Sequence, residues 1–129
     1  PVITKIRTHE MYRIVKEFNF SASHQLTWLP NDHPCSRLHG HNYIVELELQ
    51  SDTLNENGFV VDYRDLGLFK DYIDSHFDHR HLNDVLGDRN TTAEKLAHHF
   101  YDWCKDKWPE VSAVRVKETP KTTAEYRPL

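Results

Sequence analysis

Residues 39–50 read His39-Gly-His-Asn-Tyr-Ile-Val-Glu-Leu-Glu-Leu-Gln50, and this run decides the fold. Polar and apolar side chains alternate along it, which is the pattern of a strand with one buried face. Because residues i and i+2 of a strand point to the same face, His39 and His41 aim at one point in space. A second alternating run covers residues 12–24 and ends at His24. If the two runs pair as neighbouring strands, three histidines converge on one side of a sheet.

Three imidazole nitrogens with a fourth position open are the ligand set of a catalytic zinc ion rather than a structural one. A closed structural site usually has four protein ligands with paired cysteines, and no C-x-x-C pattern occurs in this sequence. The chain has 10 histidines in 129 residues, so the pair His39 and His41 could also be the polar face of an ordinary strand. The sequence therefore predicts a metal site at His24, His39 and His41, with that alternative left open.

The composition is that of one domain covering residues 1–129, which is long enough to bury a core. Charged residues make up 28% of the chain and the mean hydropathy is -0.74, which indicates a soluble protein. No apolar run approaches the ~20 residues of a membrane span, and no signal peptide is visible at the amino end. The net charge of -4, without a basic block, argues against nucleic acid as a direct partner. The two cysteines, Cys35 and Cys104, fit a reducing cytoplasm rather than a disulfide framework.

The first half of the chain contains further elements besides these two runs. Residues 1–10 lack periodicity and are expected to form a loose amino-terminal arm, and residues 25–38 should be a long loop. Asp62 is a plausible N-cap for a helix. The apolar stripe of that helix consists of Leu66, Phe69, Ile73 and Phe77.

In the second half, residues 78–84 are expected to stay irregular. Residues 91–94 read Thr-Thr-Ala-Glu and resemble a capping box for a second helix that runs to about Lys107. Residues 111–119 should form a third long strand and residues 122–127 a fourth. The order β-β-α-α-β-β predicts an α+β fold, with an antiparallel sheet and two helices on one face. Such a sheet has open edges, which favours an oligomer that pairs them.

Three other residue groups could carry chemistry. Cys35 lies close to the predicted metal site and could be a fourth ligand, a general base or an idle loop thiol; its loop position favours a base near the metal. Asp78 and His79 could form an acid–base pair or simply decorate the end of a helix, and His81 nearby is a competing candidate. Glu118 is either the solvated end of a strand or a carboxylate that accepts two parallel hydrogen bonds from an amidine-like edge.

Taken together, the motifs resemble those of the 6-pyruvoyltetrahydropterin synthase and 6-carboxytetrahydropterin synthase family, from about Tyr12 to the end of the chain. The residues that carry the resemblance are Phe20-Ser-Ala-Ser-His24, Cys35-Ser-Arg-Leu-His39-Gly-His41, Gly58-Phe-Val-Val-Asp62, Phe77-Asp78-His79, Leu82-Asn83-Asp84, Thr91-Thr-Ala-Glu94 and Val116-Lys-Glu118-Thr119. Each motif alone is weak, whereas their order and spacing together are specific.

The resemblance implies a tunnelling fold, in which three subunits close a β-barrel and two trimers stack into a homo-hexamer. It also implies one Zn²⁺ per chain, held by His24, His39 and His41. Catalytic roles would fall to four residues: Cys35 as general base, His79 with Asp78 as a charge relay, and Glu118, which also anchors the pterin. Substrate contacts are further expected from Thr119 and Arg37, and the triphosphate needs cations, for which Arg37, Arg127, Arg89 and Lys117 are candidates.

The implied activity is that of a zinc-dependent lyase acting on 7,8-dihydroneopterin triphosphate in queuosine or 7-deazapurine biosynthesis, a tRNA modification pathway. The gap of three residues between Cys35 and His39 resembles the bacterial enzymes that make 6-carboxytetrahydropterin and release acetaldehyde. Enzymes that make the pyruvoyl product tend to have a longer gap. A pyruvoyl-forming or aldolase-like enzyme stays an alternative, as does a non-enzymatic metal- or pterin-binding module.

Overall fold

The computed structural model describes residues 10–129, and the arm expected over residues 1–10 lies, except for its last residue, outside the described part. The elements follow in the order β1 (Tyr12–His24), η1 (Pro34–Ser36), β2 (His39–Ser51), η2 (Tyr63–Leu66), α1 (Gly67–His76), β3 (Arg80–His81), α2 (Leu82–Leu86), α3 (Ala93–Lys107), β4 (Val111–Lys117) and β5 (Ala124–Tyr126). No helix in residues 10–129 has the length and apolar character needed to cross a membrane.

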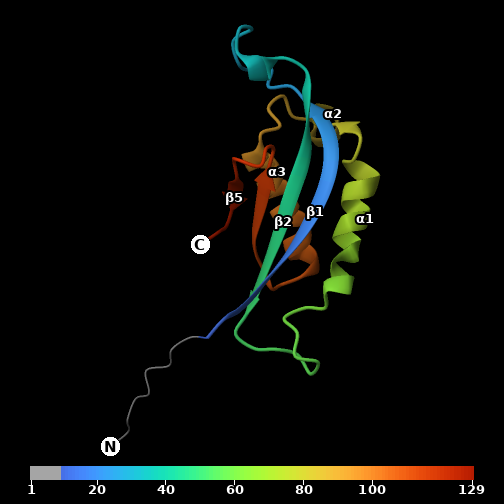
Figure 1. Cartoon of the computed structure of the whole chain (residues 1–129), viewed down its shortest axis with the longest axis vertical. Helices are drawn as coiled ribbons and strands as arrows, with labels where there is room; N and C mark the ends of the chain where they lie inside the picture. The colour runs from blue at the N-terminus through green and yellow to red at the C-terminus, as the bar shows by residue number, and fades with distance from the viewer. Residues whose placement is uncertain (1–9) are drawn as a thin grey trace, which may run out of the picture.

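The strands form one sheet in the order β3-β1-β2-β4-β5. The two long strands β1 and β2 run side by side along the length of the molecule (Figure 1), antiparallel, from Tyr12 opposite Ser51 to His24 opposite His39. The pairs β2–β4 and β4–β5 are also antiparallel, as predicted. The short β3 pairs in parallel with the end of β1, so the sheet is mixed rather than purely antiparallel.

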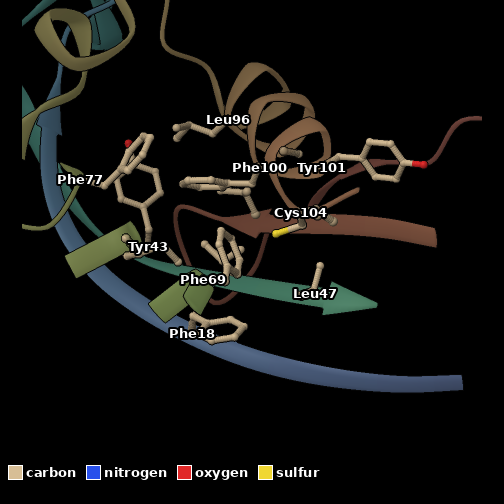
Figure 2. Close-up of a cluster of buried hydrophobic side chains, with 14 of the residues drawn as sticks. Phe18, Tyr43, Leu47, Phe69, Phe77, Leu96, Phe100, Tyr101 and Cys104 are labelled. Carbon is tan, nitrogen blue, oxygen red and sulfur yellow. The ribbon is translucent and has the colours of Figure 1, made fainter. Parts of the chain in front are cut away.

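Helices α1 and α3 cover the same face of the sheet, because the alternation in β1 and β2 gives that face its apolar side chains. Phe18 of β1 contacts Phe69 of α1 with ring centroids 4.9 Å apart. Phe20 of β1 contacts Phe100 of α3 at 6.0 Å. Figure 2 shows how these rings gather between the helices and the strands, with Leu47 of β2 beside them. The predicted apolar stripe of the first helix is fully buried in this core.

The expectation that residues 78–84 stay irregular was wrong. Asp78 Oδ1 accepts a hydrogen bond from the backbone N–H of Ser21 (2.9 Å), and the N–H of His79 donates to the carbonyl of Ser21 (2.6 Å). These two bonds draw the chain along β1, so that β3 forms there. The next residue after β3, Leu82, is fully buried and begins the short helix α2. The polar composition of this segment gave no sign of regular structure, because its contacts are made with a strand some 57 residues earlier in the chain.

Two predicted caps lie at slightly different places. Asp62 accepts from the N–H of Arg64 and caps the 3₁₀ turn η2, which precedes α1, rather than α1 itself. Helix α3 is capped by Thr92, whose hydroxyl accepts from the N–H of Lys95, one residue later than the capping box predicted. Thr91 is instead completely buried. Its backbone carbonyl contacts a histidine of β1, so it serves tertiary structure rather than the helix end.

The opposite face of the sheet holds a charged cluster around Glu48 of β2, whose side chain is fully buried. Glu48 accepts from Arg115 (2.7 Å), from Ser112 (2.6 Å) and from both terminal nitrogens of Arg127 (2.7 and 3.0 Å). Burial by itself would raise the pKa of Glu48, but the hydrogen bonds from Arg127 and Ser112 outweigh it and hold the pKa below its ordinary value. The cluster therefore ties β2, β4 and the carboxyl-terminal segment together through one ionised carboxylate.

We predict that Glu48→Gln lowers the free energy of unfolding by about 3 kcal/mol near neutral pH, because two arginines lose a buried partner. A carboxyl with a lowered pKa in the folded state stabilises the protein above its unfolded pKa, and this contribution is lost as the pH falls through the folded pKa. The difference between wild type and variant should therefore shrink on acidification below about pH 4. Urea unfolding at several pH values measures it, with Glu17→Gln, exposed on β1, as the control. A difference that stays constant with pH would contradict the prediction.

Candidate metal centre and adjoining cavities

The three predicted histidines meet at the end of the sheet. One ligand nitrogen from each of His24, His39 and His41 lies within 4.8 Å of the other two. The strand register explains this arrangement, because His24 pairs with His39 and His41 follows two residues later on the same face of β2. The predicted convergence is confirmed, and these residues could hold a metal ion.

Hydrogen bonds orient two of the rings toward one another. His24 Nδ1 lies 2.8 Å from the carbonyl oxygen of Thr91, and His39 Nδ1 lies 2.7 Å from that of Arg37. Since a carbonyl oxygen only accepts, each Nδ1 donates and each neutral ring keeps its lone pair on Nε2. The two Nε2 atoms are 2.8 Å apart. Two lone pairs facing each other at this distance fit a cation that both nitrogens bind.

The third ring, His41, has a buried nitrogen that lies beside a carboxylate without making a well-directed hydrogen bond to it. Its Nε2 is buried and has no hydrogen-bond partner within the described residues. Glu118 Oε2 lies 3.3 Å from this nitrogen. Burial lowers the pKa of both His24 and His41, which favours the neutral imidazole that metals bind. The donor set, three imidazole nitrogens with a carboxylate beside them, fits zinc.

Tyr43 lies directly below the histidines, between them and the core. Its ring contacts that of His41 edge-on, with centroids 5.4 Å apart, and stacks on Phe20 at 4.9 Å. The hydroxyl has no partner among the described residues, and burial raises the pKa of Tyr43. Tyr43 thus separates the polar site from the apolar core. Its position two residues after His41 on the same strand face was the signal that could have identified it.

Two cavities of about 690 and 480 Å³ adjoin the site and share a floor made by residues of β1 and β2. Gly40 lies in this floor against β1, and a Cβ there would lie 3.2 Å from the carbonyl oxygen of Ala22, so a larger residue would press the two strands apart by a few tenths of an ångström. The larger cavity is also lined by Asp78, Glu118 and Thr119. Glu118 comes there because β4 pairs with β2 only as far as Lys117 opposite Ile44 and then leaves the sheet.

Asp78 and His79, the residues predicted as an acid–base pair, are in contact. His79 Nδ1 lies 2.9 Å from Asp78 Oδ2, and the hydrogen bond from the Ser21 backbone is the main reason that the pKa of Asp78 lies below its ordinary value. His79 has a φ of 59°, which is unusual for a residue other than glycine and turns its exposed side chain toward the smaller cavity. The competing candidate His81 also lines this cavity, but its Nδ1 is engaged by Ser23 Oγ at 2.9 Å.

Cys35 and Arg37 are placed differently from the other predicted site residues. Both belong to the segment that leads into β2, and neither lines either of the two cavities. Cys35 lies in η1, half-buried and free of any disulfide, outside the histidine cluster. Its carbonyl accepts from the N–H of Leu26 at 2.9 Å, which holds it near the end of β1.

The cations considered for the triphosphate are already engaged in several cases. Arg127 binds Glu48, and Lys117 lies 3.6 Å from Glu46. The Arg89 guanidinium lies over the ring of Trp28, 5.4 Å from its centroid. None of the four candidates, Arg37 included, lines the two cavities among the described residues.

Comparison with known proteins identifies relatives over nearly the whole described chain. Residues 13–128 match the family described as 6-pyruvoyl tetrahydropterin synthase. A 6-carboxy-5,6,7,8-tetrahydropterin synthase from Synechocystis is 35% identical in an alignment of 122 residues that covers 90% of this chain and 93% of that protein. A putative enzyme of the same name from Archaeoglobus fulgidus is 34% identical, over 84% of this chain and 90% of its own length.

Solved structures share the fold. The 6-pyruvoyl tetrahydropterin synthase of Caenorhabditis elegans superimposes with a TM-score of 0.81 at 22% identity, covering 96% of this chain and 100% of that one. The Plasmodium vivax enzyme does so with a TM-score of 0.71 at 17% identity, covering 92% and 98%. The predicted α+β tunnelling fold is thereby confirmed. The family match over residues 13–128, together with the relative of 35% identity, shows that this chain belongs to the 6-pyruvoyl tetrahydropterin synthase family.

Proposed function

We propose that this protein is a zinc-dependent lyase that converts 7,8-dihydroneopterin triphosphate into 6-carboxy-5,6,7,8-tetrahydropterin, with release of triphosphate and acetaldehyde. The observation that carries the proposal is the cluster of His24, His39 and His41 beside a cavity lined by Glu118 and Asp78. The relatives named 6-carboxy-5,6,7,8-tetrahydropterin synthase, at up to 35% identity over most of the chain, support the choice of product.

The histidines would hold the metal through Nε2 in His24 and His39, since the carbonyls of Thr91 and Arg37 occupy their Nδ1 atoms. A bound zinc ion supplies Lewis acidity that lowers the pKa of substrate hydroxyls. The protein's part is to keep three neutral donors aimed at one place, above the apolar core that Tyr43 closes.

Glu118 is proposed to anchor the pterin. A carboxylate accepts two parallel hydrogen bonds from the N–H and NH₂ groups along one edge of a pterin ring. Glu118 lies 3.3 Å from His41 Nε2 and lines the larger cavity with Thr119. A ring held there would project its side chain toward the histidines.

Proton transfer is proposed for Cys35 and for His79 with Asp78. The Asp78 carboxylate orients the His79 ring, and we assign His79 the part of the acid partner. The Cys35 thiolate would be the base. Because Cys35 lies outside the cavity lining, the proposal requires residues 25–38 to turn the thiol toward bound substrate.

The remaining parts of the proposal concern cellular context and assembly. We propose a step in queuosine or 7-deazapurine biosynthesis, in the cytoplasm, where two free cysteines are expected. We also propose a hexamer built from two trimers. The edge of β1 supports it, because β3 pairs only with Ala22 and Ser23 and leaves the rest of that edge open to another chain.

The first prediction from this proposed function concerns zinc. His39→Ala should lose most bound metal, because one of three nitrogen donors disappears. Metal analysis of purified protein should give about one zinc per chain in wild type. His76→Ala, which removes an exposed histidine of α1, and Cys35→Ala should both keep their zinc. Full zinc content in His39→Ala would refute the assigned ligands.

The second prediction concerns proton transfer. Cys35→Ala should reduce turnover by about 10²-fold or more with substrate binding retained. His79→Asn should have a similar effect, and asparagine tolerates the positive φ at this position, so that the backbone is preserved. His81→Asn is the matched control in the same cavity. If His81→Asn lost turnover and His79→Asn kept it, the assignment of proton transfer to His79 would be wrong.

The third prediction concerns the product. The carboxy-forming reaction breaks the C1′–C2′ bond of the side chain after triphosphate leaves, and the elements of water divide between the new carboxyl group and acetaldehyde. Trapping the aldehyde as a hydrazone, with mass analysis of the pterin, should show both products in equal amounts. An intact pyruvoyl product without aldehyde would contradict this proposal. It would favour the second candidate function, that of the pyruvoyl-forming enzymes whose fold this chain shares.

A further inference from the structure

We propose that Asn83 is a positioning residue that fixes both the metal ligand His24 and the segment carrying Cys35. Asn83 is the second residue of α2 and lies in none of the cavities described above. The inference rests on the proposed function only in taking His24 as a metal ligand and Cys35 as a reactive thiol.

Every hydrogen-bonding position of the Asn83 amide is used. Oδ1 accepts from the backbone N–H of Gln25 (2.9 Å) and from the hydroxyl of Thr91 (3.3 Å). Nδ2 donates to the carbonyls of Gln25 (2.6 Å) and Arg89 (3.2 Å). A side-chain amide offers two donors and two acceptor sites, so Asn83 joins three separate segments of the chain with none to spare.

One part of this network, which we call the metal arm, holds His24 both through the backbone that follows it and through the carbonyl that binds its ring. Gln25 follows His24 directly, and Asn83 binds both its N–H and its carbonyl, which fixes the backbone where β1 ends. Thr91 accepts from His24 Nδ1 through its carbonyl, while its hydroxyl is bound to Asn83. The same side chain therefore holds the backbone beside His24 and the group that orients its ring. Such outer contacts set the direction of a ligand's lone pair and hence the affinity for metal.

The other arm reaches Cys35. The side chain of Gln25 donates to the carbonyl of Ser36 at 2.7 Å. The next residue, Leu26, donates its N–H to the carbonyl of Cys35 at 2.9 Å. Because Asn83 fixes the backbone of Gln25, it also fixes the residues to which the Cys35 segment is attached.

Only an amide suits this position. An aspartate would keep the acceptor for Gln25 and Thr91, but its second oxygen would face the carbonyls of Gln25 and Arg89 without a proton to donate. Alanine would remove the bonds to the N–H and carbonyl of Gln25 and to the hydroxyl of Thr91, whereas the carbonyl of Arg89 would still accept from Thr27. The position of Asn83 gives a physical reason why this segment is ordered, although the sequence predicted an irregular one. The pairing of β3 with β1 and the burial of Leu82 place Asn83 where it can bind Gln25.

The metal arm is tested by zinc affinity, measured by competition with a chromophoric chelator. Asn83→Ala and Asn83→Asp should weaken zinc binding by about tenfold, as loss of an outer contact does elsewhere. Thr91→Val removes only the hydroxyl that Asn83 binds and should weaken zinc binding by less. Asp84→Ala, the exposed neighbour on α2, should leave the affinity unchanged.

The Cys35 arm is tested by limited trypsin digestion of the metal-free protein. Arg37 is the single lysine or arginine in residues 25–38, so cleavage after it, identified by mass, reports opening of this segment. Asn83→Ala and Asn83→Asp should be cut there several-fold faster than wild type or Asp84→Ala.

Neither measurement uses substrate, so the result does not depend on the reaction proposed above. If Asn83→Ala and Asn83→Asp lowered the melting temperature but kept wild-type zinc affinity and wild-type cleavage after Arg37, the role would be structural only and the inference would fall. If wild type itself bound no zinc, the proposed function and the metal arm would fall together, while cleavage after Arg37 would still decide the other arm.

Discussion

The antiparallel register of β1 and β2 is the constraint on which the rest of the structure depends. It places His24 opposite His39 and, on the same face, Phe20 opposite Tyr43. A slip of one residue would move every side chain of one strand to the other face, and the histidines would separate at the same moment as the core. The apolar contacts that stabilise the fold therefore also specify the candidate metal centre. No separate element is needed to assemble the three ligands.

The two faces of the sheet perform different tasks. One face packs under α1 and α3, with Phe69 and Phe100 in the core (Figure 2). The same face ends in the histidines. The other face carries a buried carboxylate, Glu48, which two arginines and a serine satisfy. Pairing between β2 and β4 ends at Lys117, and the next residue, Glu118, lies beside His41. The cavity is thus a consequence of where strand pairing stops.

The segment between α1 and α3 connects the candidate site to strand β1. Asp78 binds the backbone of Ser21, and this contact both aligns β3 with β1 and holds in place the carboxylate that contacts His79. A few residues later, Asn83 binds Gln25, which follows the candidate metal ligand His24. Residues that look like a polar connection are in fact the part of the chain that positions two sides of the site. Their hydrogen bonds are local in space and distant in sequence.

The sequence by itself determined the two long strands, the two main helices, the shared face of His24, His39 and His41, and, through its motifs, the family. The strands, the helices and the common face of His39 and His41 follow from periodicity within one segment. Placing His24 beside them also required the two strands to pair, and the family rests on the order of the motifs along the chain. Only the tertiary structure decided that Thr91 orients His24, that residues 80–86 form a strand and a helix, and that Cys35 lies outside the cavity lining. The partners of His24 and Asp78 lie 67 and 57 residues away along the chain. Contacts at that separation depend on how the packed elements meet, and no local pattern of residues encodes them.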